Sequence, residues 1–562
     1  MFVKTTKAKN YEYIKLVETY REAGKVKHRV LFNFGRRDLI KNDKMFVRMV
    51  KKLCEIAEIP LQESDQELPA CSEAELLQYG YLAYRKLYEE LGIANTLRSI
   101  QSSTDATYPL EETVFLMALQ HLMDPRSKRG TCERQSQYYG LKEVQLHQLY
   151  RSLNILKDHK EGIEKSLFDQ RYACLADQVD VVFYDVTTFA FESVIADALR
   201  DFGFSKDQKF KEVQIVMGLM IDAQGIPIGY ELFPGNTSDG KTLIKSLENI
   251  NRRFGIHRVI IVADRGINSK GNLKAIKEAG YGYIVASRIR QMSRKIQQEI
   301  LDLEGYTHVS PDFRYKTLEY SNIFKDEEQI LHSLSENLVI SYSAKRAEKD
   351  RKDRQRLIDK AQKMLAKPSS IKASTKRGGR KYLKEGNTTE YSLDEKRIRQ
   401  DEIFDGYYAI QTSEMDMPVS DILEAYHTLW KIEESFRIMK STLEVRPVFH
   451  WSSERIHGHF VVCFLAFLME RQLEIKLSKE EATPEKIREA LKSMQLAKVT
   501  LNNEEVFIKA KGLPLGTTIF KELGIKQPGN ICYENDLKER FKIQPKENFQ
   551  QISMIWPNKD HL

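Results

Sequence analysis

Two short apolar runs, each ending in an acidic residue, are the most informative pattern in the chain. Residues 181–193 read VVFYDVTTFAFES and residues 257–266 read HRVIIVADRG, so Asp185 and Asp264 each follow strand-forming residues. Such runs predict buried strands. A buried acid is costly unless it is paired, so each aspartate either leaves the core with its strand or is neutralised by a cation. Two such strands side by side would place a carboxylate pair at one sheet edge, which suits hard divalent cations.

The segments around these two runs predict the rest of an α/β sheet. Residues 213–222 and 226–233 flank a turn and predict an antiparallel hairpin. Residues 239–253 and 269–279 show helical spacing, and residues 281–287 form another apolar run. The resulting order of strand, hairpin, helix, strand, helix, strand is that of a ribonuclease-H-like sheet. The fold class we expect is α/β, with a ribonuclease-H-like mixed sheet, an insertion domain and helical flanking regions.

Outside the predicted sheet, the chain divides into segments with different predicted secondary structure. Residues 11–34 predict a hairpin, which is either an ordinary structural element or a small docking or DNA-contacting one. We expect helices in 38–100 and 110–170, and a mostly helical, then loop-rich tail after about 475. The expected domains are 1–70 (hairpin and helix), 71–175 (helical, DNA-binding), 176–290 (core, first part), 291–400 (basic insertion), 401–475 (core, second part) and 476–562 (C-terminal region).

The insertion is highly charged and is not expected to continue the sheet. Residues 345–367 hold ten basic and four acidic side chains and predict a solvated helix. Residues 368–384 add six basic residues with Ser and Gly, which is typical of a flexible loop. The charge run is either a solvated face or a contact for a DNA backbone. Residues 401–411 again predict a strand.

Residues 421–444 predict one amphipathic helix, because apolar residues recur at three- and four-residue steps. At 100° per residue, Tyr426, Glu433 and Lys440 lie within about 40° of one another on that helix. Glu434 lies roughly 80° away from Tyr426 by the same geometry. Glu433, and not Glu434, therefore shares a stripe with the tyrosine and the lysine.

Composition narrows the class of protein only moderately. The net charge of +8 among 562 residues is weak support for a polyanionic partner. Six cysteines without a CxxC pair indicate reduced thiols and neither a zinc site nor a disulfide frame. The N-terminus has no apolar signal segment. The longest apolar run, residues 460–469, is too short for a bilayer and predicts a buried helix.

One motif favours a different class of enzyme. Residues 235–242, GNTSDGKT, match the phosphate-binding pattern G-x-x-x-x-G-K-[ST] of nucleotide hydrolases. The preceding strand, however, belongs to the predicted antiparallel hairpin, whereas strands before such loops belong to parallel sheets. Asp239 would also put a negative charge inside an anion-binding loop. A turn leading into the next helix is the structural alternative.

Asp185, Asp264 and Glu433, with a long insertion before the third acid, resemble the DDE transposases of bacterial insertion sequences. The last helix is similar to the IS-four signature Y-x(2)-R-x(3)-E-x(6)-K, which stands here as Tyr426, Leu429, Glu433 and Lys440. The sequence departs from this signature at Leu429, where the family has Arg. The phosphate contact of that Arg would then come from Lys431 or Arg437, or be missing.

The resemblance implies metal-dependent DNA cleavage and strand transfer that move an insertion sequence. Asp185, Asp264 and Glu433 would converge to hold two divalent ions, Mg²⁺ or Mn²⁺, and Tyr426 and Lys440 would contact DNA phosphate. The implied partners are double-stranded DNA, as transposon ends and target, and a second copy of the chain. The implied location is the cytoplasm, at the bacterial nucleoid, with no membrane association. A nuclease without strand transfer and a non-catalytic DNA-binding protein remain as alternatives.

Overall fold

The computed structural model covers most of the chain. It describes residues 1–8, 11–22, 25–40, 43–59, 75–172, 181–191, 193, 195–203, 212–237, 239–254, 259–325, 329–366, 378–385, 391–445, 448, 450, 452–480, 482–501 and 504–541. Within these ranges, no helix combines the length and the apolar character needed to cross a membrane.

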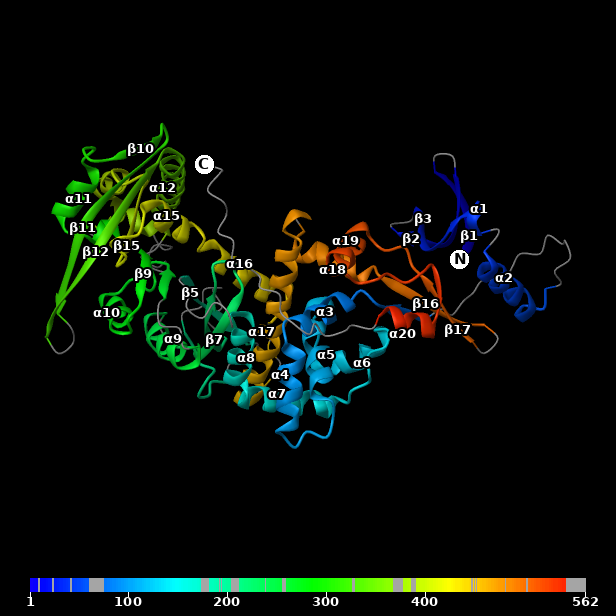
Figure 1. Cartoon of the computed structure of the whole chain (residues 1–562). Helices are drawn as coiled ribbons and strands as arrows, with labels where there is room; N and C mark the ends of the chain where they lie inside the picture. The colour runs from blue at the N-terminus through cyan, green and yellow to red at the C-terminus, as the bar shows by residue number, and fades with distance from the viewer. Residues whose placement is uncertain are drawn as a thin grey trace.

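Nine strands of the described chain form one mixed sheet, in the order β10-β11-β12-β15-β9-β8-β5-β6-β7 (Figure 1). Its central half comprises β5 Val181–Ala190, β6 Gln214–Ile221, β7 Pro227–Pro234, β8 Ile260–Ala263 and β9 Gly282–Ala286. Strands β5, β8 and β9 run parallel, while β6 pairs antiparallel with both β5 and β7. With the hairpin on one side of β5 and the parallel strands on the other, this is the ribonuclease-H-like order. The predicted fold class and hairpin are confirmed.

Strand β5 is buried on both faces, and its alternating side chains separate two apolar cores. Val182 and Tyr184 pack with apolar residues of α9 Asp239–Phe254 and α10 Lys270–Glu278. Phe183 and Phe189 belong to the opposite core, which includes α16 and α17. Odd-numbered positions of β5 therefore share a face with these later helices.

The insertion extends the sheet, contrary to expectation. Strand β12 (Leu331–Ser343) pairs with β11 (Phe313–Lys325) on one side and with β15 (Tyr407–Thr412) on the other. Leu338, Val339 and Ile340 of β12 are buried in succession, but the polar residues before and after them and the charged residues of β11 hide these strands in the sequence. The other insertion elements are η2 Ile289–Gln291, α11 Arg294–Leu301, β10 Thr307–Ser310, α12 Ala344–Leu365, η3 Gly378–Tyr382, β13 Leu383–Glu385, β14 Tyr391–Leu393 and α14 Glu395–Glu402. Helix α12 matches the predicted solvated helix, whereas most of the predicted basic loop lies outside the described residues.

The single helix predicted over 421–444 is divided in the structure. It forms α15 (Val419–His427), α16 (Trp430–Arg437) and a π-helical turn, η4 (Ile438–Thr442). At the first break the Thr428 hydroxyl donates to the carbonyl of Glu424, and the Leu429 amide donates to the carbonyl of Tyr426 three residues back. Side-chain hydroxyls that compete for helical carbonyls disturb the regular ladder. The uniform angular spacing assumed across 421–444 is therefore wrong.

A helical region surrounds α17 (Ser453–Lys476), in which every residue from Gly458 to Leu473 is buried. Its glycine allows a close approach, since a Cβ on Gly458 would lie 1.9 Å from the carbonyl oxygen of Leu153. The run predicted as a buried helix lies inside α17. The surrounding elements are β4 Glu75–Gln78, α3 Leu82–Glu90, α4 Ile93–Ser102, α5 Leu110–Met123, α6 Lys128–Arg134, η1 Gln135–Gln137, α7 Leu146–Asp158 and α8 Lys160–Tyr172.

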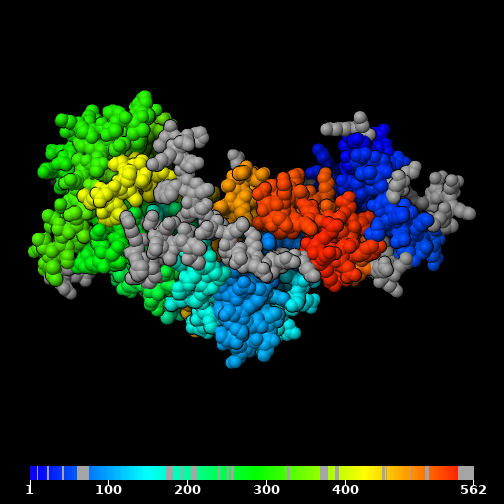
Figure 2. Space-filling model, viewed as in Figure 1, coloured from blue at the N-terminus to red at the C-terminus, as the bar shows by residue number. Residues whose placement is uncertain are grey.

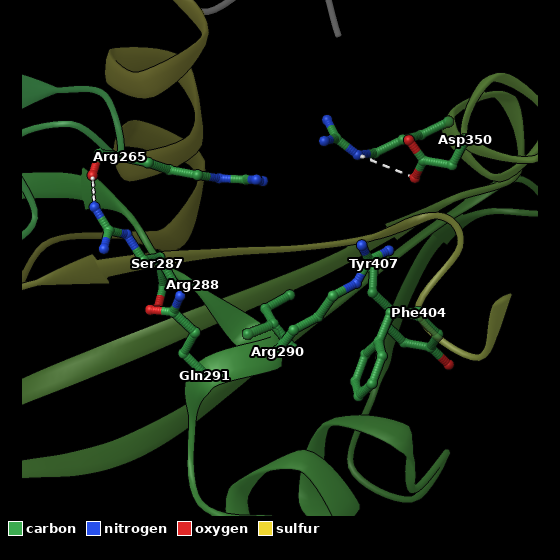
Figure 3. A pocket seen from close by; sticks show the side chains of 10 residues that line it. Arg265, Ser287, Arg288, Arg290, Gln291, Asp350, Phe404 and Tyr407 are labelled. Atoms are coloured by element: carbon green, nitrogen blue, oxygen red, sulfur yellow. Dashed lines mark hydrogen bonds and ion pairs between the residues drawn. The ribbon is translucent and has the colours of Figure 1, made fainter. Parts of the chain in front are cut away.

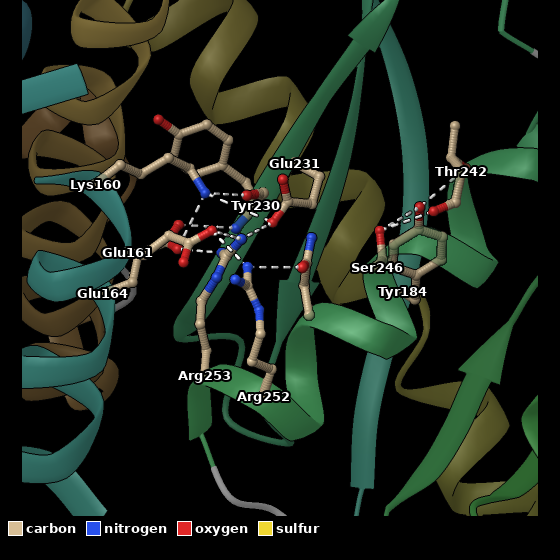
Figure 4. Close-up of polar contacts among 11 residues, drawn as sticks. Lys160, Glu161, Glu164, Tyr184, Tyr230, Glu231, Thr242, Ser246, Arg252 and Arg253 are labelled. Carbon is tan, nitrogen blue, oxygen red and sulfur yellow. Dashed lines mark hydrogen bonds and ion pairs between the residues drawn. The ribbon is translucent and has the colours of Figure 1, made fainter. Parts of the chain in front are cut away.

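An ion-pair network joins this helical region to the sheet (Figure 4). Glu164 of α8 accepts from Arg253 of α9 at 2.6 Å and from Lys160 at 3.1 Å. Arg253 also pairs with Glu231 of β7, and Lys160 donates to the main-chain carbonyl of Tyr230 at 2.7 Å. Glu164 and Arg253 are almost fully buried, so losing one partner would leave an unpaired charge in the interior.

The two ends of the described chain pack together (Figure 2). Strands β1 Phe2–Ala8, β2 Tyr11–Glu22 and β3 Lys25–Arg36 form an antiparallel sheet, which confirms the predicted hairpin and adds a strand. Phe32 and Met49 pack on strands of the C-terminal region. That region contains strands in a four-stranded sheet with β4, where helices and loops were predicted. The remaining elements are α1 Arg37–Ile40, α2 Lys44–Ile56, η5 Ser478–Glu480, α18 Pro484–Lys492, β16 Gln495–Leu501, β17 Glu504–Lys509, α19 Pro514–Glu522, β18 Ile531–Tyr533 and α20 Glu534–Arg540.

Candidate active site

The two aspartates lie side by side, but only Asp264 is at a strand end. Strand β5 continues past Asp185 to Ala190, so the prediction that its strand ends at the acid is wrong. Strand β5 pairs with β8 in parallel register, with Phe183 opposite Val262. Asp185 and Asp264 each follow two residues after these partners, so they occupy equivalent positions on neighbouring strands. Phe183 and Val262 both face the core shared with α16 and α17, and side chains two residues apart point to the same face. The strand alternation therefore directs both carboxylates towards that face.

Asp264 is exposed at the end of β8, where its carboxylate begins a tight turn. One carboxylate oxygen accepts from the Gly266 amide at 2.7 Å. The other oxygen makes no hydrogen bond or ion pair within the described chain. An exposed carboxylate on a turn anchored to a buried strand is available to a ligand and is held by a rigid element.

Glu433 reaches the same face from α16, which packs against β5. Ile432 and Phe436 are buried in the shared core, whereas Glu433 is exposed and makes no ion pair with any described residue. The carboxylate oxygens of Asp185, Asp264 and Glu433 are not all within 4.8 Å of one another. Three carboxylates repel one another, and two ions about 3.5–4 Å apart accept a wider spread of ligands than a single ion.

The neighbouring Glu434 is engaged elsewhere. Its carboxylate pairs with Arg471 of α17 at 3.1 Å and with Arg437 at 3.3 Å. Arg471 is nearly buried and also pairs with Glu474 at 2.7 Å. The ion pair between Glu434 and Arg471 therefore connects α16 to α17.

Tyr426 lies near Asp264, and Lys440 lies on the face of β5 that Asp185 shares. The Tyr408 hydroxyl of β15 donates to the hydroxyl of Tyr426. Burial raises the pKa of Tyr426, with further increases from Tyr408 and from the negative charge of Asp264. The ammonium of Lys440 lies 5.6 Å from the centre of the Phe189 ring, on the β5 face of Asp185.

The other predicted cations have contacts of their own. Lys431 donates to the main-chain carbonyl of Ala223 at 2.8 Å, in the hairpin turn between β6 and β7. Arg437 is exposed and pairs with Glu434. Leu429, at the position of the signature Arg, is buried in the apolar core and offers no polar group.

A pocket rich in arginine begins next to Asp264, and the sequence analysis did not identify it. It has a volume of about 430 Å³ and is lined by Arg265, Arg288, Arg290 and Arg346, together with Tyr407 and other residues (Figure 3). Arg288 donates to the carbonyl of Arg265 at 2.8 Å. One signal in the sequence could have identified this pocket. Arg288 and Arg290 follow β9, and Arg265 follows β8. Because parallel strands end at one edge of a sheet, these three arginines are expected to lie close together.

The phosphate-loop motif does not form a phosphate site. The carbonyl of Gly235 accepts from Gln214 at 2.9 Å, and a Cβ on Gly235 would lie 2.1 Å from the Gln214 carbonyl oxygen. The Thr242 hydroxyl is buried and accepts from Tyr184 at 2.9 Å (Figure 4). The strand before the motif is antiparallel to its neighbour, as predicted. Ser238 lies outside the described residues.

Comparison with known proteins agrees with this geometry. The transposase DDE domain matches residues 178–469, and the N-terminal domain of IS1634 family transposases matches residues 3–64. No curated protein is similar enough in sequence to count as a match.

Solved transposase structures show distant similarity. The piggyBac transposase synaptic complex with hairpin DNA is 10% identical, with a TM-score of 0.32, over 75% of this chain and 83% of that one. The Mos1 transposase paired-end complex with left transposon end is 14% identical, with a TM-score of 0.14, over 44% and 70%. The expected IS-four type stays a prediction, because the N-terminal match is to another named family. Enzymes with the matched domain use divalent metal ions, and this chain belongs to their family: it is a DDE transposase of an insertion sequence.

Proposed function

We propose that Asp185, Asp264 and Glu433 form the catalytic metal site and bind two divalent ions, Mg²⁺ or Mn²⁺. The adjacent positions of the two aspartates on β5 and β8 are the observation that carries this proposal. All three donors are carboxylates, one within strand β5, one directly after β8 and one on helix α16, and hard cations prefer such oxygen ligands. Bound at this site, divalent ions would activate the attacking hydroxyl and stabilise the leaving oxygen.

The surrounding cations would bind the DNA backbone. Tyr426, near Asp264, and Lys440, on the Asp185 face of β5, would contact the phosphates next to the scissile bond. Arg437, exposed on α16, and Lys431 would contact phosphates further along. The arginine pocket would accept phosphate oxygens beyond Asp264, because guanidinium groups form paired hydrogen bonds with phosphate.

The complete reaction would be end cleavage followed by strand transfer into target DNA. Transposon ends and target are both double-stranded DNA, and two ends have to be brought together, so we propose that two copies of the chain act as a homodimer. We place this activity in the bacterial cytoplasm, on nucleoid DNA.

The test compares Asp185→Asn and Asp264→Asn with the unmodified chain. Each variant should lose Mg²⁺-dependent cleavage of a transposon-end duplex by at least about 100-fold, because the loss falls on the chemical step. Binding of the same duplex should stay within about twofold, since neither carboxylate contributes favourably to phosphate binding. Cleavage by either variant at the normal rate would refute the assignment. Cleavage by the unmodified chain without joining to target DNA would show a nuclease that does not transfer strands.

A further inference from the structure

A buried cluster of two histidines and a cysteine lies in the helical region, away from the carboxylates. His121 is on α5, and His459 and Cys463 are one turn apart on α17. All three side chains are buried, and their potential ligand atoms lie within 4.8 Å of one another. The sequence predicts reduced thiols and no zinc site, because the six cysteines form no CxxC pair. His459 is near Cys463 in the chain, but His121 is far from both.

The distances within the cluster fit a tetrahedral metal ion. Cys463 Sγ lies 3.9 Å from His121 Nε2 and 3.5 Å from His459 Nε2. Zinc bonds of about 2.3 Å to sulfur and 2.0–2.1 Å to nitrogen, at the tetrahedral angle, place sulfur and nitrogen about 3.6 Å apart.

The outer contacts also suit metal ligation. His121 Nδ1 lies 2.9 Å from the carbonyl oxygen of Leu443, while its Nε2 faces Cys463. A metal-bound histidine almost always donates its second ring nitrogen to such a carbonyl or to a carboxylate. His459 is buried, and its Nδ1 has no hydrogen-bond partner in the described part of the chain.

We propose that His121, His459 and Cys463 bind one Zn²⁺ ion that stabilises the fold. The nearest additional donor is His450, whose ring centre lies 5.2 Å from that of His459. Two cationic side chains, Lys128 and Arg488, act electrostatically on His121, and Arg488 donates to the main-chain carbonyls of His121 and Leu122.

The position of the cluster gives the ion a structural role. The carbonyls of Leu443 and Val445, which contact His121 and His459, belong to the segment that follows η4. That segment leads directly from α16, which carries Glu433. An ion bound by α5 and α17 would fix the histidines that hold this segment, and through it the end of the Glu433 helix.

The experiment measures metal content and Co²⁺ spectra of the full-length chain without a histidine tag. We expect about one tightly bound Zn²⁺ per chain after dialysis in Mg²⁺ buffer. Co²⁺ replacing it should give a thiolate-to-cobalt charge-transfer band and intense tetrahedral visible bands. Cys463→Ser should lose the charge-transfer band, whereas Cys132→Ser, a matched control on α6, should keep it.

The carboxylate site provides the second control. Asp264→Asn should keep both the zinc and the charge-transfer band, since carboxylates give no thiolate transition. A folded unmodified chain that binds Zn²⁺ only substoichiometrically and shows no charge-transfer band would overturn the proposal. So would a band that survives Cys463→Ser or disappears in Asp264→Asn. The unmodified chain decides the question even if Cys463→Ser does not fold.

Discussion

Glu433 and Glu434 are adjacent, yet replacing them should have opposite consequences. Glu433 is exposed on the face of the two aspartates, whereas Glu434 pairs with Arg471 at 3.1 Å. Glu433→Gln should abolish Mg²⁺-dependent cleavage and leave the free energy of unfolding unchanged or slightly higher, because it removes one of three mutually repelling charges. Glu434→Gln should leave cleavage nearly intact and destabilise the fold.

The size of the second effect follows from the burial of the pair. The Arg471 side chain is 8% exposed and that of Glu434 is 23% exposed, so the pair lies between surface and buried salt bridges. Surface pairs contribute about 0–1 kcal/mol, and breaking buried ones costs about 3–5 kcal/mol. Gln keeps a neutral hydrogen bond and Arg471 keeps Glu474 at 2.7 Å, which favours the lower part of this range. We therefore expect a loss of about 1–2 kcal/mol, or roughly 2–8 °C in Tm for the catalytic unit.

Thermal unfolding and single-turnover cleavage of the same duplex, measured on both variants, test this pair of expectations. The informative result is the crossed pattern: activity lost with Tm kept for Glu433→Gln, and Tm lowered with activity kept for Glu434→Gln. If Glu434→Gln abolished cleavage while Glu433→Gln cleaved at the normal rate, the third acid would have been assigned to the wrong residue.

Three further predictions concern other parts of the chain. Lys241→Ala should leave cleavage unchanged and the chain should not hydrolyse ATP; ATP turnover that depends on Lys241 would contradict the structure of that loop. Replacing Lys349, Lys360 and Lys363 of α12 with Ala should flatten the slope of log K against log salt by about 0.9 per lost phosphate contact, and an unchanged slope would mean a solvated face only. Burial raises the pKa of Glu470 from 4.5 to about 8, so the folded chain keeps a proton that the unfolded chain releases in this window. Stability to urea should therefore fall as pH rises from 5 to 8, by up to about 1.4 kcal/mol per unit, and Glu470→Gln should remove that fall.

The catalytic half of the sheet could be predicted because its signals are local. Strands β5, β8 and β9 are short apolar runs, and their connections leave few arrangements for a right-handed parallel sheet. Asp185 and Asp264 could be paired before the structure was known, because each follows the apolar run of a predicted parallel strand, although β5 itself continues to Ala190. Glu433 needed the resemblance to a known signature, since nothing local distinguishes it from Glu434 except an angular argument.

The failures have physical causes that the sequence conceals. Strand β11 has four charged residues and β12 is mostly polar, so neither shows the apolar alternation that predicts a strand. The predicted helix over 421–444 breaks at Thr428, whose hydroxyl competes for a backbone carbonyl. The spacing of apolar residues does not reveal this competition. The arginine pocket and the cluster of His121, His459 and Cys463 draw residues from distant segments, and only tertiary structure brings them together.

The continuity of the sheet changes how the insertion should act. Because β12 pairs with β15 and β15 with β9, the strands of the insertion extend the same sheet that carries both aspartates. Arg346 of α12 lines the same pocket as Arg265, the residue after Asp264, and its guanidinium lies 4.4 Å from the ring centre of Tyr408, which contacts Tyr426. DNA bound along α12 would therefore extend into the arginine pocket and reach the three acids. All of these groups lie on, or pack against, one continuous sheet. Substitutions in the insertion should alter the position of the scissile phosphate as well as the affinity for DNA, which a separately hinged DNA-binding domain would not do.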